Sequence, residues 1–83
     1  MSIYVATFYT HLSAQLSCKR LRSVGCAAQM MPVPRVLSSS CGTCVRYEGE
    51  GECRELLDTD TEALYEVQGA GKYRLLWHDD TNL

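Results

Sequence analysis

Hydrophobic and polar residues follow two different periods along the chain, and these periods predict its strands and helices. Residues 3–9 are rich in β-branched and aromatic side chains and predict a strand. A helix is expected between Thr10, which suits an N-cap, and Gly25, which suits the position after a helix end. At 100° per residue, its predicted core stripe consists of Ala14, Cys18, Leu21 and Val24. Leu12 and Leu16 lie nearly opposite this stripe and are expected to be exposed.

The rest of the pattern predicts three further strands, a short second helix and a C-terminal arm. The expected strands are residues 26–31, 43–48 and 64–68. The short helix, over residues 52–58, carries Cys53, Leu56 and Leu57 on its apolar side. The arm is the last apolar segment, residues 73–77.

The order β-α-β-β-α-β predicts an α+β domain of the ferredoxin-like kind, with two helices on one face of an antiparallel sheet and a short C-terminal β arm. Residues 1–83 are expected to form a single domain, because a chain this short buries only about 60% of its unfolded surface. The first strand is apolar on both sides. Tyr4 or Phe8 on an uncovered sheet face therefore predicts a surface for docking or for forming a homodimer.

Charge is distributed unevenly along the chain. Residues 1–46 contain five Lys or Arg residues and no acid, whereas residues 47–83 contain ten acids and three cations, for a net charge of −2. The scattered cations do not form the basic footprint of a nucleic-acid-binding protein, so no nucleic-acid partner is expected. The asymmetry predicts a locally positive environment up to Arg46, which favours anions.

Segments that direct a chain into or across a membrane are not expected. No apolar run approaches the roughly 20 residues that a membrane helix needs. The first nine residues have no basic region and too short an apolar stretch for a signal peptide. We therefore expect a cytoplasmic location and no membrane partner.

The chain contains five cysteines: Cys18, Cys26, Cys41, Cys44 and Cys53. An odd number without an export signal does not favour a disulfide framework. In a reducing cytoplasm, buried cysteines pack as small hydrophobes, while exposed ones take part in metal or nucleophile chemistry. The positions of Cys18, Cys26 and Cys53 on predicted helix stripes and at a strand start predict packing roles.

Residues 32–42 stand apart because a hairpin loop needs only about 2–5 residues. The segment begins with two prolines and ends in Ser38, Ser39, Ser40, Cys41 and Gly42. Gly42 permits a positive φ, which lets consecutive backbone N–H groups form a concave anion site. Arg35 and Arg46 flank the loop, and together with the hydroxyls they favour the thiolate of Cys41. The sequence therefore predicts a nucleophilic thiolate presented on a loop.

This run, Pro-Val-Pro-Arg followed by Ser-Ser-Ser-Cys-Gly and an arginine-bearing strand, resembles a family of small bacterial domains. It is the selenium/sulfur carrier protein-like family, formerly classed as a domain of unknown function, and the resemblance extends from Tyr4 to about Tyr73. The resemblance implies a carrier whose motif cysteine, Cys41, holds a persulfide or a selenium-bearing sulfur. The other positions that match the motif are Pro34, Arg35, Ser38, Ser39, Ser40, Gly42 and Arg46.

The resemblance implies a stoichiometric carrier rather than a turnover enzyme, and no cofactor is expected. The implied donor is a cysteine desulfurase or a selenocysteine lyase. The implied acceptor is a selenophosphate-forming or thiolation-pathway enzyme. Arg35, Arg46 and the backbone of residues 38–42 are expected to stabilise the anionic outer sulfur or selenium atom.

Cys44 departs from the family pattern and keeps alternatives open. It completes a Cys-Gly-Thr-Cys spacing in which Cys44 could act as a resolving thiol. Three extended residues span about 10 Å, and a disulfide needs Cα atoms within about 7 Å, so closure requires a turn at Gly42 and Thr43. One rival is therefore a thiol-disulfide redox protein using Cys41 and Cys44; another is a non-catalytic protein-interaction module. No metal site is expected, because no second Cys-x-x-Cys pair exists.

Overall fold

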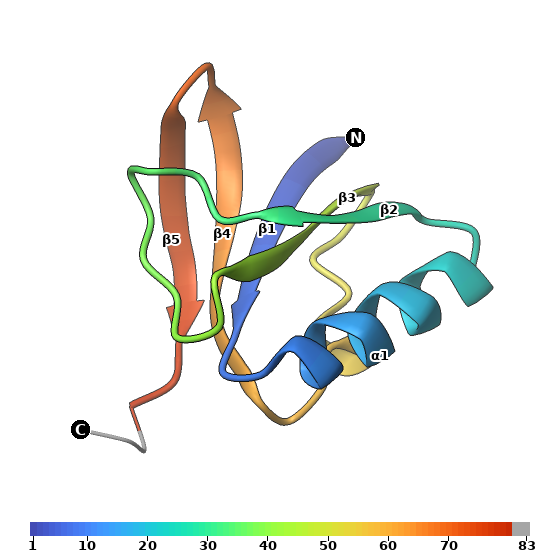
Figure 1. The fold of residues 1–83 in the computed structure, drawn as a ribbon. Coiled ribbons are helices and arrows are strands. Elements are labelled where there is room, and N and C mark those ends of the chain that lie inside the picture. The colour runs from blue at the N-terminus through green and yellow to red at the C-terminus, as the bar shows by residue number, and fades with distance from the viewer. Residues whose placement is uncertain (81–83) are drawn as a thin grey trace.

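Five antiparallel strands form one sheet in the order β2-β3-β1-β4-β5 (Figure 1). The structure is a computed structural model that describes residues 1–80, so the end of the predicted domain, residues 81–83, lies outside the described residues. The strands are β1 (Ser2–Phe8), β2 (Ala27–Pro32), β3 (Thr43–Gly49), β4 (Thr61–Gly69) and β5 (Lys72–His78). The described residues also form one helix, α1 (His11–Ser23), and one 3₁₀ turn, η1 (Arg54–Leu56). The predicted α+β class is confirmed.

The first half of the chain folds into a β1-α1-β2 unit that is split by β3. Both β1 and β2 pair antiparallel with β3, so they run parallel to each other and α1 connects them. Thr10 caps α1 as predicted, since its hydroxyl oxygen accepts a hydrogen bond from the Ser13 N–H at 3.1 Å. This bond satisfies one of the N–H groups that a helix leaves unpaired at its start.

The main core lies between α1 and one face of the sheet. Its largest sheet residues are Tyr4, Phe8, Val45, Tyr47 and Leu64. The predicted helix stripe is confirmed for Ala14, Cys18 and Leu21, which are all buried. Val24 was wrongly placed on this stripe: it is 58% exposed, because the helix ends at Ser23 and Val24 is its C-cap. Leu12 and Leu16 are exposed as expected.

The predicted second helix over residues 52–58 is wrong, and with it the two-helix ferredoxin-like plan. The segment contains only η1, which is preceded by Cys53 in a left-handed conformation and followed by Leu57 in an extended one. Seven residues are too few to offset the cost of helix nucleation, and glycines precede them. In place of a helix, Leu64 and Trp77 border an open hollow of about 330 Å³.

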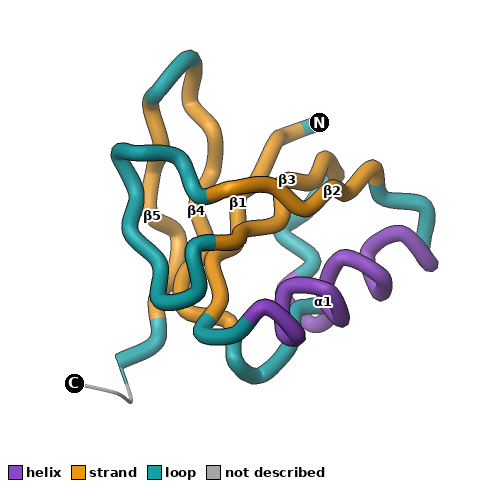
Figure 2. The backbone as a smooth tube through the Cα atoms, in the orientation of Figure 1, coloured by secondary structure: helices purple, strands orange, loops and turns teal. Residues whose placement is uncertain are grey.

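The C-terminal arm pairs within the sheet as strand β5. It runs antiparallel to β4, with Trp77 opposite Leu64 and Tyr73 opposite Val67. On the sheet face opposite α1, the long connection between β2 and β3 folds back over the strands, as the tube in Figure 2 shows. Helix α1 has 13 residues and is not long and apolar enough to cross a membrane.

Candidate functional site

The connection between β2 and β3, residues 33–42, carries the predicted thiol and is fastened at its base. We call it the β2–β3 loop. The N–H of Val33 donates to the carbonyl of Gly42 at 3.2 Å, and the N–H of Leu37 donates to the carbonyl of Pro34 at 3.0 Å. Gly42 has a φ of 74°, a left-handed conformation that glycine adopts without a steric penalty. The proline and the glycine singled out by the sequence therefore shape the loop at its two ends.

Cys41 lies near the end of the β2–β3 loop, half-buried against the core. Its S–H donates to the carbonyl of Thr43 at 3.4 Å. The Ser39 hydroxyl lies 4.0 Å from the sulfur and donates to the carbonyl of Phe8 at 3.1 Å. The thiol therefore has fixed neighbours while the residue keeps part of its surface accessible to solvent.

A carboxylate from β4 also reaches the β2–β3 loop. Glu62 accepts two hydrogen bonds from Ser40, one from the backbone N–H at 3.1 Å and one from the hydroxyl at 3.0 Å. Glu62 is the unpaired residue on β4 at the register shift between Thr7 and Phe8. A β-bulge redirects the side chain of its extra residue, and such bulges are common beside functional sites. Here the bulge residue contacts the residue next to Cys41.

These contacts change the electrostatics predicted for the loop. The hydroxyls of Ser39 and Ser40, expected to serve a bound anion, already donate to Phe8 and Glu62. The acidic half of the chain thus supplies a carboxylate to Ser40, the residue before Cys41, so the expectation of a locally positive environment is wrong at this point. The sequence did not connect Glu62 with the loop, because 22 positions separate it from Ser40.

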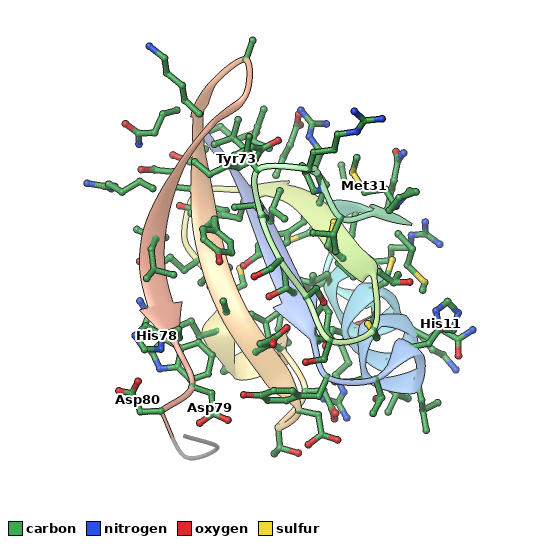
Figure 3. The ribbon with its side chains drawn as sticks, turned by 60° about the vertical axis from the view of Figure 1, so that its left-hand side comes forward. His11, Met31, Tyr73, His78, Asp79 and Asp80 are labelled. Atoms are coloured by element: carbon green, nitrogen blue, oxygen red, sulfur yellow. The ribbon has the colours of Figure 1, made fainter. Side chains whose placement is uncertain are left out.

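Arg46, one of the two predicted arginines, lies on β3 beyond the β2–β3 loop. Arg46 is three residues along β3 from Thr43, about 10 Å in an extended strand. It lines a hollow of about 370 Å³ whose other walls include Met31, Pro34 and Tyr73. Figure 3 shows Met31 and Tyr73 in the upper half of the molecule.

Arg35 and Ser38, two further predicted site residues of the loop, are exposed. Arg35 lies in the turn between Pro34 and Leu37, and Ser38 follows that turn. Within residues 1–80, no hydrogen bond or ion pair joins Arg35 or Arg46 to Cys41. The structure therefore brings Ser39 to the sulfur, and the part of the two arginines in the site stays a prediction.

The fold brings His11 close to the site, although nothing in the sequence had connected this histidine with Cys41. Nδ1 of His11 lies 3.4 Å from Oγ1 of Thr43, whose carbonyl accepts the Cys41 S–H. Figure 3 shows His11 at the start of α1. Thirty-two positions separate His11 from Thr43, so no local pattern could have revealed this contact.

A known protein family matches most of the chain. The family described as "Putative Se/S carrier protein-like" matches residues 3–69, most of the chain. The chain belongs to this family. The match confirms the resemblance drawn from the loop motif, and it covers every candidate site residue of this Se/S carrier-like protein. Comparisons with curated proteins and with solved structures found no match.

Cys44, the second cysteine of the Cys-Gly-Thr-Cys spacing in this Se/S carrier-like protein, is fully buried on β3. Its S–H donates to the carbonyl of Pro32 at 3.8 Å, whereas Cys41 donates to Thr43. Burial, together with the nearby Cys41 thiol, raises the pKa of Cys44 to about 11. At neutral pH Cys44 is therefore protonated and a poor nucleophile.

The other three cysteines of this family member pack as expected. Cys18 is buried in α1, and Cys26 and Cys53 lie half-buried against the core. All five cysteines are free thiols. In the part of the chain that the structure describes, no group of three or more His, Cys, Asp or Glu side chains is arranged to hold a metal ion.

Proposed function

We propose that this protein carries sulfane sulfur or selenium on Cys41, as a persulfide or a selenosulfide, and transfers it to an acceptor protein. The observation that carries the proposal is the contrast between the two thiols of the β2–β3 region. Cys41 is partly accessible on a loop fastened through Ser39 and Ser40, whereas Cys44 is fully buried. A carrier needs one reachable thiol in fixed surroundings. Membership in the Se/S carrier-like family supports the same assignment.

Loading is a thiol exchange. The Cys41 thiolate attacks the outer sulfur of a persulfide on the donor enzyme, the donor S–S bond breaks, and the donor leaves as a thiolate. The proton of Cys41, held near the Thr43 carbonyl, passes to water. Nothing is oxidised overall, because the sulfur atom moves in its sulfane state. Attack on selenium bound to a donor gives the corresponding S–Se bond.

The burial of Cys44 protects the cargo. A persulfide is lost when a second thiolate attacks its inner sulfur, which forms a disulfide and releases hydrogen sulfide. With a pKa of about 11, Cys44 is ionised to only about one part in ten thousand at pH 7. This low reactivity supports a one-thiol carrier over a redox protein that uses Cys41 and Cys44.

The outer atom of a loaded Cys41 is anionic near neutral pH and needs hydrogen-bond donors. Ser39 can supply one if loading turns its hydroxyl, which lies 4.0 Å from the sulfur, away from the Phe8 carbonyl to which it donates in the unloaded protein. In this proposal the β2–β3 loop backbone at Gly42 contributes as well. Arg35 and Arg46 stay predicted members of the anion-binding set, and Arg35→Gln and Arg46→Gln variants test them in the loading assay.

The partners and the location follow from the family in this proposal. The donor is a cysteine desulfurase or a selenocysteine lyase, and the acceptor is a selenophosphate-forming or thiolation-pathway enzyme. The exchange takes place in the cytoplasm. The protein acts stoichiometrically, because each Cys41 carries one atom per transfer.

Intact-mass measurement tests the proposal. The chain is incubated with a cysteine desulfurase and cysteine, or with a selenocysteine lyase and selenocysteine. We expect an adduct of about 32 Da for sulfur or about 79 Da for selenium. The adduct should be absent in Cys41→Ser and present in Cys44→Ser.

Trypsin releases residues 36–46 as one peptide that holds both Cys41 and Cys44, so the Cys44→Ser variant also assigns the modified sulfur. An unmodified chain beside an active donor, or an adduct that persists in Cys41→Ser, would contradict the carrier function.

A further inference from the structure

The hollow of about 370 Å³ that Arg46 lines crosses the whole sheet. We call it the Arg46 hollow. Each of the five strands contributes one side chain to it, in the order of the strands across the sheet: Met31, Arg46, Val5, Val67 and Tyr73. Its volume falls within the roughly 300–1,000 Å³ that small-molecule sites occupy.

The strand register explains why these side chains meet. Arg46 lies directly opposite Val5, and Tyr73 lies directly opposite Val67, so the members of each pair share one face of the sheet. Side chains alternate between the two faces along a strand. Tyr4 and Tyr47, the neighbours of Val5 and Arg46 in the chain, belong to the core that α1 covers. The Arg46 hollow therefore lies on the face opposite α1.

Apolar and backbone groups make up most of the lining. Pro34, at the start of the β2–β3 loop, and residues 69–71, the turn between β4 and β5, border the hollow. Val5 is only 1% exposed and is the most deeply buried group at the hollow. Met31 and Tyr73, labelled in Figure 3, come from the two outermost strands that contribute to it. The lining is thus built from fixed strands rather than from one mobile segment.

Arg46 carries the only charge among the residues that line the hollow. Within residues 1–80 it forms no ion pair, not even with Glu48, two positions along β3. Arg74, on the same hairpin as Tyr73, is by contrast paired with Glu66 at 2.6 Å. The guanidinium of Arg46 therefore has no competing carboxylate and can offer its N–H donors to a ligand.

We propose that the Arg46 hollow binds a small free carboxylic acid with an apolar body. The carboxylate pairs with the guanidinium, whose planar shape matches it through two parallel N–H···O hydrogen bonds. The apolar body packs against Met31, Val67 and the ring of Tyr73. This binding does not involve Cys41 and goes beyond the proposed carrier function.

Both parts of such a ligand are needed for binding. An ion pair with an exposed arginine contributes little by itself, so a carboxylate without an apolar body binds weakly. A neutral ligand of the same shape gains the apolar contacts but leaves the charge of Arg46 unpaired. Phenylacetate, which has both parts, is therefore the probe, and acetate and phenylacetamide each lack one part.

Nuclear magnetic resonance titration of the isotopically labelled natural chain tests the proposal. We expect phenylacetate to shift the backbone amide signals of Arg46, Val67 and Tyr73, with a dissociation constant of about 1 mM, as is typical of a ligand of this size. Acetate and phenylacetamide should each bind at least about fivefold more weakly.

Three variants complete the experiment. Arg46→Gln should weaken phenylacetate binding about five- to tenfold, because it removes the charge and keeps an amide of similar reach. Arg74→Gln is the matched control and should leave binding unchanged, since the Arg74 guanidinium is paired with Glu66. Cys41→Ser should also bind normally, so this result and the loading assay succeed or fail separately.

Three outcomes would overturn the proposal. They are an equal affinity for phenylacetamide and phenylacetate, shifts that map to Trp77 and the other hollow, and no shift at about 10 mM phenylacetate. The comparison of the three probes on the natural chain decides the matter even if a variant does not fold.

Discussion

Glu62 accepts a hydrogen bond from each of the two donors of Ser40, the backbone N–H at 3.1 Å and the hydroxyl at 3.0 Å. The contact spans 22 positions of sequence and ties the β2–β3 loop to the bulge on β4. Because Ser40 directly precedes Cys41, Glu62 fixes the backbone beside the sulfur. Hydrogen bonds to a carboxylate are about twice as strong as those between neutral groups, so Glu62 holds this part of the loop firmly.

Replacing Glu62 should therefore make Cys41 more reactive. In Glu62→Gln the side chain keeps its size but loses the charge that strengthens both Ser40 hydrogen bonds, and we expect the loosened loop to raise the rate of Cys41 alkylation at pH 7 by roughly two- to tenfold. Glu66→Gln is the matched control, since the Glu66 carboxylate is paired with Arg74 at 2.6 Å. An unchanged rate in Glu62→Gln would show that the carboxylate does not act on the sulfur.

Cys44 should be unreactive in the folded protein. With a pKa of about 11, its thiolate fraction at pH 8 is about one part in a thousand. In Cys41→Ser, iodoacetamide should leave Cys44 unmodified at pH 8 and modify it only near pH 11 or after unfolding. Peptide mass measurement of residues 36–46 gives the answer. Rapid modification of Cys44 at pH 8 in the folded chain would revive the redox-pair hypothesis.

Thr7 offers a test of the energetics of the buried sheet face. Its Oγ1 is the one buried side-chain nitrogen or oxygen among residues 1–80 without a hydrogen-bond partner. An unpaired buried hydroxyl costs about 1–3 kcal/mol, so Thr7→Val should raise the free energy of unfolding by about 1 kcal/mol. Urea unfolding measures the change.

Thr61 provides the matched comparison for Thr7. It is also buried on a strand, but its Oγ1 donates to the carbonyl of Asp58 at 2.6 Å. Thr61→Val should therefore lower the free energy of unfolding by about 1 kcal/mol. Equal destabilisation by Thr7→Val and Thr61→Val would mean that the Thr7 hydroxyl has a partner.

Asp58 should make the stability depend on pH in the acid range. Its carboxylate accepts a hydrogen bond from the Ser13 hydroxyl at 2.8 Å, and this bond, aided by Arg20, lowers its pKa. A pKa lowered by folding stabilises the protein above the unfolded value of about 3.9, and this contribution is lost as the pH falls through the folded value. Asp58→Asn should flatten the decline of unfolding free energy below about pH 4. Asp60→Asn, at an exposed position, should not.

Features fixed by neighbouring residues could be predicted from the sequence. The cap at Thr10 and the buried stripe of Ala14, Cys18 and Leu21 depend only on residues one to four positions apart. Prediction failed where local preference was weak. The segment over residues 52–58 has one turn's worth of helix-forming residues, and its contacts with the core favour a 3₁₀ turn over a helix.

In the candidate site, too, contacts between neighbouring residues could be predicted, whereas contacts between distant residues could not. Cys41 and Ser39 are two residues apart, and the motif that contains them was recognised directly. Glu62 and His11 reach the loop region because of a strand bulge and the placement of α1, respectively. Neither arrangement is encoded in a short stretch of sequence, so both acid and histidine could be found only after folding. Arg46 follows Thr43 by three positions on β3, and no hydrogen bond among residues 1–80 joins it to the thiol, so its part in the site stays a prediction.

Strand β5 lies beyond residues 3–69, the part of the chain that the family shares, yet it covers the outer side of β4. A bare β4 would present a row of unsatisfied backbone groups to other copies of the chain, the usual starting point for aggregation. The outermost strand instead bears Lys72, Arg74 and His78, whose charge and polarity discourage further strand addition. The last hairpin therefore gives the sheet a charged outer strand in place of an unpaired edge at β4.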